Sequence, residues 1–453
     1  MLSAFANSLK IPELRKRLLF TAGLLFICRL ISNVPVPGVD AVDLQELVRR
    51  LSEQQGEAGF FGWIDLFSGG ALSQCAVGAL SIWPYISASI IIQLMTAIVP
   101  ALERLAREGD VGRAKLTQYT RYLTLVICFL QGLALCRGFL ENPEAFGALG
   151  QGLTLVNNPG WGFRIMTILT MTTGTMMMMW LGEQITDRGI GNGISLVITV
   201  NIISRLPMAV YEAFNMFRKV DGEAQFGIFY LFFLVIMIFL VIAGTIMLVQ
   251  GQRQIPIHTA KRQVGRKTYG GQKTFMPLRV NYTGVMPIIF AGPMLAFPVM
   301  ILKRINLEFC QKMGAALTVG QPAYLIVYAI LILFFSYFWV ATQFNPLQIA
   351  DNLKGNGGFI PGIRPGKPTA EYLDKTMTRL TLVGAIGLTV LAVLPQLLTE
   401  AFGIPFGVAS FMGGTSLLII VGVALDTMRQ VETYLLDRHY DGFLKKGKLR
   451  GRR

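Results

Sequence analysis

Acidic residues are absent from every long apolar stretch of this sequence. All 26 aspartates and glutamates lie between those stretches. A pump or proton-coupled carrier usually keeps a carboxylate at mid-membrane, because a moving charge needs a partner there. The absence disfavours a multi-span secondary transporter, which stays the alternative interpretation. The question is then what could pass through an interior that has no acidic residue.

Residues that hold metals or perform catalysis are also scarce. Five cysteines are scattered without a C-x-x-C pair, and the only histidines are His258 and His439. This pattern predicts neither a disulfide framework nor a metal cluster. The sequence has no G-x-S-x-G, H-E-x-x-H or Walker A motif. We therefore expect no catalytic, metal-binding or cofactor-binding residues, and we do not expect an enzyme.

Apolar residues are abundant: 53% of the 453 residues are hydrophobic, only 15% are charged, and the mean hydropathy is +0.53. Soluble proteins of this length carry more charge. A membrane-spanning helix needs about 20 apolar residues. We place ten spans at 18–36, 72–100, 119–140, 162–182, 191–210, 226–250, 284–302, 319–342, 380–399 and 405–425. The sequence thus predicts an all-α polytopic membrane protein.

Basic residues are distributed unevenly between the two sides that these spans define. The segments on the side of the two termini carry 29 Lys and Arg, and the opposite segments carry 7. Cytoplasmic loops are enriched in Lys and Arg. We therefore expect both termini to be cytoplasmic, and we expect the cytoplasmic face to attract acidic lipid, acidic protein or RNA.

The spans form two groups of five, separated by a polar segment at residues 211–225. We expect an N-terminal half at 1–210, an external hinge linker at 211–225 and a C-terminal half at 226–453. Inverted repeats are common in proteins that open a central pathway. Sequence similarity between the two halves does not by itself establish such a repeat.

Two cytoplasmic segments, 251–281 and 343–379, are too long for simple connectors. The first carries seven basic residues and no acid, and the second contains Gly- and Pro-rich runs at 355–358 and 361–366. Such runs favour a shaped loop tip over a helix. Positive-inside topology explains some of the charge but not the length, so we favour a docking surface.

A short apolar piece at 60–67 is followed by Ser68, Gly69 and Gly70. Eight helical residues span only about 12 Å, which is too short to cross a bilayer. The pattern fits equally well a half-helix that dips into the membrane on a glycine hinge and an interfacial helix outside it.

Span 2 contains Pro84, which should bend the helix by removing a backbone donor. Its polar residues should face another helix or a wet seam. Isoleucines at 82 and 86, and at 194 and 198 in span 5, are four apart and share a helix face. Spacing alone favours ordinary packing for them. The glycines at 189, 191 and 193 have the wrong spacing for a phosphate loop and predict a tight turn.

Several stretches together resemble the SecY family, the channel subunits of bacterial protein translocons. They are Phe-Ser-Gly-Gly-Ala-Leu-Ser at 67–73, the span-2 sequence at 84–93, Trp-Leu-Gly-Glu-Gln-Ile-Thr at 180–186 with the turn to 195, Pro-Leu-Arg-Val-Asn at 277–281, 359–366, and Gly-Gly-Thr-Ser-Leu-Leu-Ile at 413–419. Each stretch is modest, but their order and spacing are specific, and the resemblance covers nearly the whole chain.

The resemblance implies ten helices in two pseudosymmetric halves around a central pore, through which unfolded preproteins pass and from which membrane helices leave sideways into lipid. It implies a plug at about 60–70 and a lateral gate between spans 2, 3, 7 and 8. The implied pore ring is Ile82, Ile86, Ile194, Ile198, Ile289 and Ile419; the plug is Phe61, Trp63, Ile64, Leu66, Phe67, Gly69 and Gly70; the gate has Ser87 and Gln93; the docking residues are Arg262, Arg266, Lys267 and Arg364. An apolar constriction of this kind dewets when empty and so blocks ions.

The resemblance also implies partners and a location. These are SecE and SecG in a heterotrimer, the SecA motor ATPase or a ribosome as the driving force, signal sequences and preproteins as clients, and the phospholipid bilayer of the bacterial inner membrane. The sequence departs from the family pattern at Ser81, where glycine is usual, and at Trp83, which is bulkier than the common methionine. These departures concern the packing near the gate.

Overall fold

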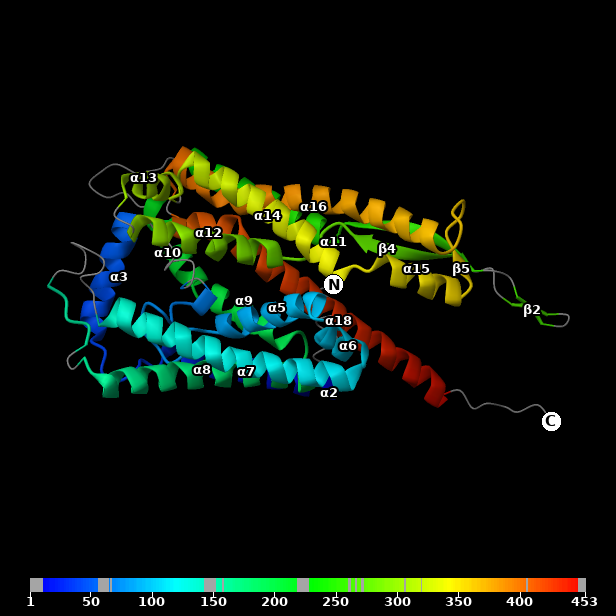
Figure 1. Cartoon of the computed structure of the whole chain (residues 1–453), viewed down its shortest axis with the longest axis horizontal. Coiled ribbons are helices and arrows are strands. Elements are labelled where there is room, and N and C mark those ends of the chain that lie inside the picture. Colours follow the sequence, from blue (N-terminus) through cyan, green and yellow to red (C-terminus); the bar gives the residue numbers. More distant parts are fainter. Residues whose placement is uncertain are drawn as a thin grey trace. The chain divides into compact units, whose positions relative to one another are not determined.

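The computed structural model describes residues 11–55, 65, 67–141, 152–156, 159–217, 228–259, 262–264, 267–269, 273–304, 307–318, 320–404 and 406–446. Within these residues the chain is built mainly of helices (Figure 1). It divides into two compact units, residues 1–209 with 420–453 and residues 210–419. Each unit is described separately below.

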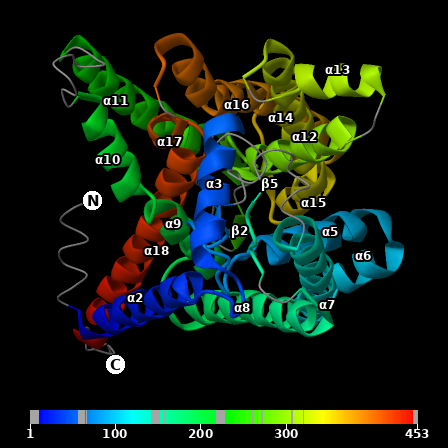
Figure 2. The same ribbon diagram turned by 90° about the vertical axis from the view of Figure 1, so that its left-hand side faces the viewer.

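The regular elements among the described residues of the first unit are helices. Its elements are α2 (Pro12–Asn33), α3 (Ala41–Gln55), α5 (Trp83–Ile98), α6 (Pro100–Arg107), α7 (Asp110–Leu135), the π-helix η1 (Cys136–Leu140), α8 (Trp161–Arg188), α9 (Gly193–Ile203), the start of α10 (Leu206–Phe217) and most of α18 (Thr415–Lys446). Helix α8 packs against α2, α7 and α9, and Figure 2 shows α2 running beside it.

The second unit combines helices with a small sheet. It contains α11 (Ile228–Gln250), β1 (Gln252–Thr259), β2 (Arg262–Val264), β3 (Lys267–Tyr269), β4 (Lys273–Arg279), α12 (Met286–Arg304), α13 (Glu308–Ala316), α14 (Pro322–Gln343), α15 (Pro346–Gly355), β5 (Gly358–Phe359), α16 (Lys367–Phe402) and α17 (Phe406–Met412). Helix α14 packs against α12 and α16, and α11 packs against α16 and α17.

Every predicted span overlaps a helix. Seven helical segments among the described residues are long and apolar enough to cross a membrane, or eight when the bent pair α5 and α6 counts as one span. The other two predicted spans coincide with α2 and α12. The all-α polytopic class is confirmed, while the count of ten crossings is consistent with these helices and stays a prediction.

The predicted bend at Pro84 is wrong, because the twelve residues before α5 are not helical. Residues 71–82 form turns and an isolated bridge, and α5 begins at Trp83 with Pro84 in its first turn. A first-turn proline loses no hydrogen bond, since that N–H has no partner within a helix. The bend in this region comes later, where α5 and α6 meet at 100° beside Pro100.

The last helix, α18, belongs mostly to the first unit, although its opening residues up to Ile419 belong to the second. Val431 of α18 packs with Leu14 and Ile190. The backbone N–H of Gly191 donates to Gln430 Oε1 at 2.8 Å. The C-terminal part of α18 thereby completes the turn between α8 and α9.

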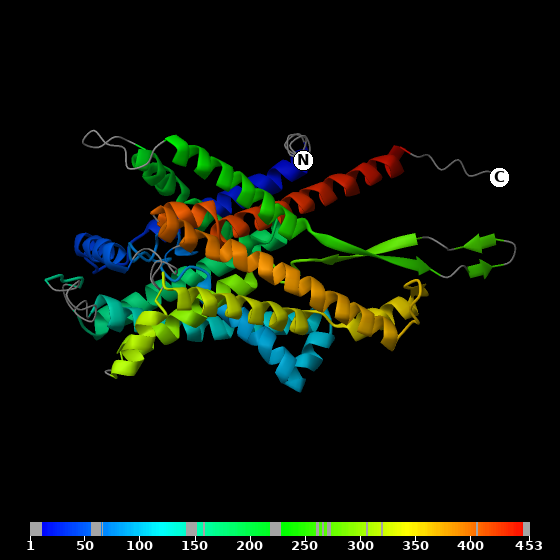
Figure 3. The same cartoon turned by 90° about the horizontal axis from the view of Figure 1, so that it is seen from above.

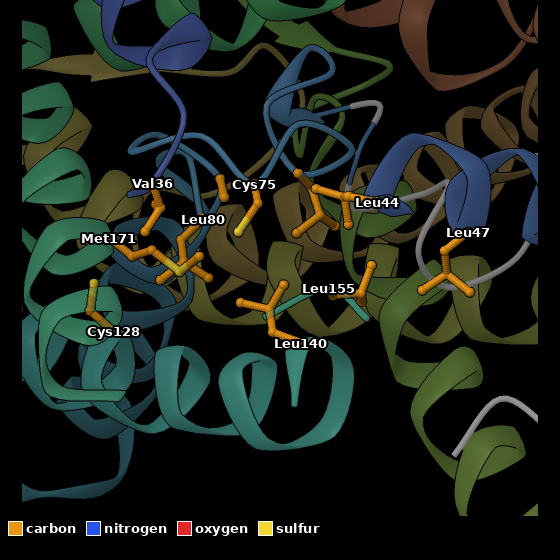
Figure 4. Packing of buried hydrophobic residues seen from close by; sticks show 11 residues of the cluster. Val36, Leu44, Leu47, Cys75, Leu80, Cys128, Leu140, Leu155 and Met171 are labelled. Carbon is orange, nitrogen blue, oxygen red and sulfur yellow. The ribbon is translucent and has the colours of Figure 1, made fainter. Parts of the chain in front are cut away.

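The first unit has a core that holds the non-helical segment in place. Figure 4 shows side chains from α3, α7, η1 and α8 gathered around the chain near Cys75 and Leu80. Leu44 and Leu47 of the amphipathic helix α3 are fully buried there. The core members are Val36, Leu44, Leu47, Leu72, Cys75, Ala79, Leu80, Cys128, Leu140, Leu155 and Met171.

The two predicted docking segments share one sheet in the order β4-β1-β5. Strands β1 and β4 pair antiparallel from Gln252↔Arg279 to His258↔Lys273, and β5 adds to β1 through His258↔Phe359. Figure 3 shows the long strands extending away from the helices of this unit. The sequence predicted two protruding loops, but not their pairing.

The predicted hinge linker at 211–225 is partly helical. Helix α10 continues to Phe217, and 218–227 lie outside the described residues. The compact units divide the chain at 209/210 and 419/420. The two pseudosymmetric halves remain a prediction.

Candidate functional site

The end of the predicted plug lies against α5. Phe67 is buried, and its ring centroid lies 5.7 Å from that of Trp83. Gly69 and Gly70 follow with positive φ angles of 68° and 88°, in the left-handed region that favours glycine. Four predicted plug residues, Phe61, Trp63, Ile64 and Leu66, lie outside the described residues.

The backbone carbonyl of Phe67 accepts two hydrogen bonds from side chains. Asn201 Nδ2 donates to it at 3.2 Å and Ser81 Oγ at 3.3 Å. Asn201 Nδ2 also lies 3.1 Å from Ser81 Oγ and donates to it. Ser81 has a φ of 52°, which explains why glycine suits this position. The serine thus accepts backbone strain while contacting the plug.

The carbonyl of Gly69 is held in a similar way by two other side chains. Arg29 Nη1 donates to it at 3.3 Å and Ser204 Oγ at 3.4 Å. Arg29 Nη1 also approaches Asn201 Oδ1 at 3.5 Å. Backbone groups at membrane depth need partners when no helix supplies them, and these side chains supply them.

Asp65 connects the plug end to the chain at α10 through an ion pair with Arg205, which lies in the turn directly before that helix. Its other carboxylate oxygen, Oδ1, accepts hydrogen bonds from the Ser73 amide at 3.0 Å and from Ser68 Oγ at 3.1 Å. The residue is only 7% exposed. One carboxylate therefore orders its own loop and joins that loop to a helix.

Two predicted pore-ring residues lie at the start of α5. The Ile86 N–H donates to the Ile82 carbonyl at 3.0 Å, so the two residues share one helical turn. Both are buried. The spacing argument holds at this pair, although Ile82 caps the helix and is not inside it.

The pair Ile194 and Ile198 lies on α9 and is half-buried. The tight turn before it is confirmed, because side chains occupy its donors: Thr21 Oγ1 accepts from the Ile190 N–H at 3.1 Å and Thr186 Oγ1 from the Gly193 N–H at 2.9 Å. A Cβ added at Gly193 would collide with the Gly182 carbonyl oxygen. Glycine allows this close approach of α8 and α9.

The remaining ring candidates belong to the second unit. Ile289 lies on α12 and Ile419 on α18, and both are buried. These two side chains are apolar, as are those of the four ring candidates in the first unit. A single ring of six stays a prediction.

The two gate candidates on α5 differ from each other. Ser87 Oγ donates to the Trp83 carbonyl at 3.0 Å, so its hydrogen bond is satisfied within the helix. Gln93 is exposed among the described residues. Of these two candidates, Gln93 is therefore the one whose polar group is open to a neighbour.

Arg364 lies on an exposed tip whose backbone is shaped by two glycine turns. Thr369 Oγ1 donates to the Arg364 carbonyl at 2.9 Å, and Gly362 and Gly366 turn the chain at φ angles of 83° and 104°. Arg262 lies in β2 and Lys267 in β3, while Arg266 lies outside the described residues. A fixed backbone that presents a guanidinium is suited to binding an acidic partner.

Sequence reasoning missed the polar network around Asp65. The available signal was the set of arginines near span ends, since a buried cation with no acid in any span must find its partner elsewhere. Arg205 pairs with Asp65, Arg121 binds Glu183 through two hydrogen bonds of 3.0 and 2.7 Å, and Arg164 pairs with a glutamate at 2.7 Å.

The chain matches known protein sequences over nearly its full length. The SecY family profile matches residues 76–428. The protein translocase subunit SecY of Streptomyces coelicolor is 44% identical over 459 residues, covering 98% of this chain and 100% of that protein. The Escherichia coli K12 protein of the same name is 43% identical, with 97% and 96% covered.

Solved structures share the fold at lower identity. One described as a protein conducting channel has a TM-score of 0.56 at 17% identity and covers 92% of this chain and 91% of its own. Sec61 in a canine ribosome-channel complex has a TM-score of 0.52 at 17% identity, with the same coverage.

Proposed function

Because the chain belongs to the SecY family of protein translocase subunits, we propose that its uncharged isoleucines and its plug together seal a protein-conducting channel. The observation that carries this proposal is the position of Ile82 and Ile86 at the start of the helix whose Trp83 contacts Phe67 of the plug. In this proposal the ring and the plug end are two layers of one seal.

The chemistry of the ring suits a conduit for many sequences. An unfolded chain presents every kind of side chain, so a charged constriction would select among segments and would conduct ions. Isoleucine is stiff at χ1 and apolar, and an apolar constriction loses its water when empty. The ring would therefore open for polypeptide and close again without a binding site for any one sequence.

The double variant Ile86→Asn, Ile198→Asn tests this seal. We expect the purified complex in a planar bilayer to conduct ions without substrate at least tenfold more than the parent, because water persists in a polar constriction. Ile91→Asn with Ile203→Asn is the matched control. These residues lie five positions further on α5 and α9, about 140° around each helix, and each is 42% exposed.

Equal conductance of the assembled seal variant and the parent would show that these isoleucines are packing residues. Conductance of the control variant equal to that of the seal variant would show a general loss of packing. The proposal requires that only the first pair leak.

The paired cytoplasmic segments are proposed to dock the driving partner, the SecA motor or a ribosome. The support is the exposed Arg364 on its fixed tip and the basic segment 251–281. The chain would supply no hydrolysis of its own, and energy would come from that partner.

Apolar faces left uncovered by this chain suit lipid and the small membrane partners SecE and SecG. Helix α11 exposes Phe229 at 85% and Phe239 at 68%. Co-purification of two small membrane subunits would support the heterotrimer, and a stable, active single chain would contradict it.

The proposed location is the bacterial inner membrane with both termini in the cytoplasm, supported by the excess of basic residues on that side. Single cysteines at Lys267 and Lys312 in a cysteine-free variant should react with impermeant reagents from opposite faces. Labelling of both from one face would contradict the orientation.

A further inference from the structure

We propose that Asp65, Arg205, Arg29 and Asn201 form a polar latch that holds the plug end closed and sets how strong a signal sequence must be to open the channel. The inference rests on the proposed role of residues 60–70 as a plug. It adds specificity-determining residues from α2, from α9 and from the turn before α10, all within the first unit.

One part of the latch holds the backbone of the plug end and does not depend on the side chains of Phe67 or Gly69. The Phe67 carbonyl is bound by Asn201 and Ser81, and the Gly69 carbonyl by Arg29. Carbonyls that have left helical geometry need donors when water is excluded. Displacing the plug breaks these hydrogen bonds together, so the closed position is favoured as a unit.

The ion pair of Asp65 with Arg205 strengthens this hold. Asp65 Oδ1 binds the Ser73 amide at 3.0 Å, which leaves Oδ2 to bind Arg205. A buried carboxylate without its cation is strongly disfavoured. Movement of this loop away from α10 is therefore opposed until water or substrate can solvate both charges.

Gly69 fits the latch because it has no side chain. A Cβ at this position would lie 2.7 Å from Arg29 Nη1, 2.7 Å from the Asn201 carbonyl oxygen and 2.9 Å from Ser204 Oγ. Its φ of 68° also disfavours other residues. The groups around Gly69 thus fit closely against the plug backbone, and this contact is independent of the ion pair.

A latch of this kind would set how strong a signal sequence must be by changing the fraction of channels that are open to bind it. If the closed state is favoured, the apparent affinity for any signal sequence falls by the fraction of channels able to bind it. A strong signal saturates the channel despite this reduction, but a weak signal does not. Weakening the latch should therefore help weak signals most.

The experiment uses the reconstituted complex with Asp65→Asn, Arg205→Gln and the double variant. Asparagine keeps an oxygen for the Ser73 amide, so Asp65→Asn removes the charge and spares the loop. We expect at least tenfold faster hydrogen exchange of the amides of residues 70–73 and a measurable ion leak. Transport should rise about tenfold for a preprotein with a shortened apolar signal and less than twofold for the intact one.

Coupling and rescue separate a latch from general damage. The effect of the double variant should be much smaller than the sum of the two single effects, because both substitutions disrupt the same interaction. Arg205→Lys keeps the charge and should restore most of the slow exchange. Glu141→Gln with Arg164→Gln breaks another ion pair of the first unit, joined at 2.7 Å, and should leave exchange at 70–73 unchanged.

Should the charge variants fail to assemble, Ser204→Ala removes the hydroxyl that donates to the Asn201 carbonyl at 2.6 Å and to the Gly69 carbonyl at 3.4 Å, and it should still raise exchange and leak, by a smaller factor. Parent-level exchange, leak and signal preference in assembled latch variants would overturn the latch. If the isoleucine seal variant leaks while the latch variants do not, the proposed seal stands and only the latch fails. If neither leaks, the seal itself fails.

Discussion

The two units use polar residues in opposite ways. In the first unit, side chains such as Arg29 and Asn201 bind the non-helical backbone of the plug end. In the second unit, basic residues lie on the strands β1 to β4 and on the glycine-rich tip between α15 and α16 (Figure 3). In the functions proposed above, the first unit uses polar groups to restrain the plug end, and the second unit presents basic groups to a partner.

If these proposals are correct, one membrane chain carries out sealing and docking in separate units. A seal requires buried donors whose partners are backbone groups. A docking surface requires exposed charge on a rigid frame, which the sheet and the buried Ile255 provide. The two tasks should therefore fail separately when each region is altered.

Gly193→Val should have the largest effect, because it forces apart α8 and α9. The added Cβ would collide with the Gly182 oxygen and lie 2.8 Å from Ile185 Cβ. We expect loss of most folded complex, measured by size-exclusion recovery after detergent extraction. Gly244→Val in α11 is the control, since nothing lies within 4 Å of its Cβ position. Equal recovery of both would contradict the close packing.

Ile255→Ala and Leu47→Ala together test whether docking and sealing fail separately. Each residue is at most 1% exposed, one at the base of the sheet and one in the core beside the non-helical segment. Each truncation should cost about 2–5 kcal/mol locally. We expect the first to lower motor-stimulated transport without an ion leak, and the second to raise the leak without lowering motor binding. The opposite pattern would break the comparison.

Arg364→Glu should have the smallest effect on stability, because its side chain is exposed. Reversal replaces an attractive contact by a repulsive one, and we expect about tenfold weaker motor-stimulated transport with an unchanged leak. Lys312→Glu on α13 is the control, since Lys312 is also exposed and pairs only locally with Glu308 at 2.7 Å among the described contacts. A normal rate for Arg364→Glu would remove the tip from the docking surface.

The spans, the turn at 189–193 and the shaped tip could be predicted because hydropathy and glycine act locally. The start of α5 could not, since a proline at 84 is compatible with a bend or with a first turn. The Asp65–Arg205 pair joins residues 140 positions apart, and no periodicity encodes it. The pairing of β5 with β1 is equally non-local.

The contacts of helix α18 with the rest of the first unit can form only late in synthesis. Residues 210–419 must be made before Gln430 can accept the Gly191 N–H and Val431 can cover Ile190. At roughly 5–20 residues per second, this takes on the order of 10–40 s. During that time the nascent turn between α8 and α9 has neither contact. The time needed to synthesise the second unit therefore limits when the first unit can complete its packing.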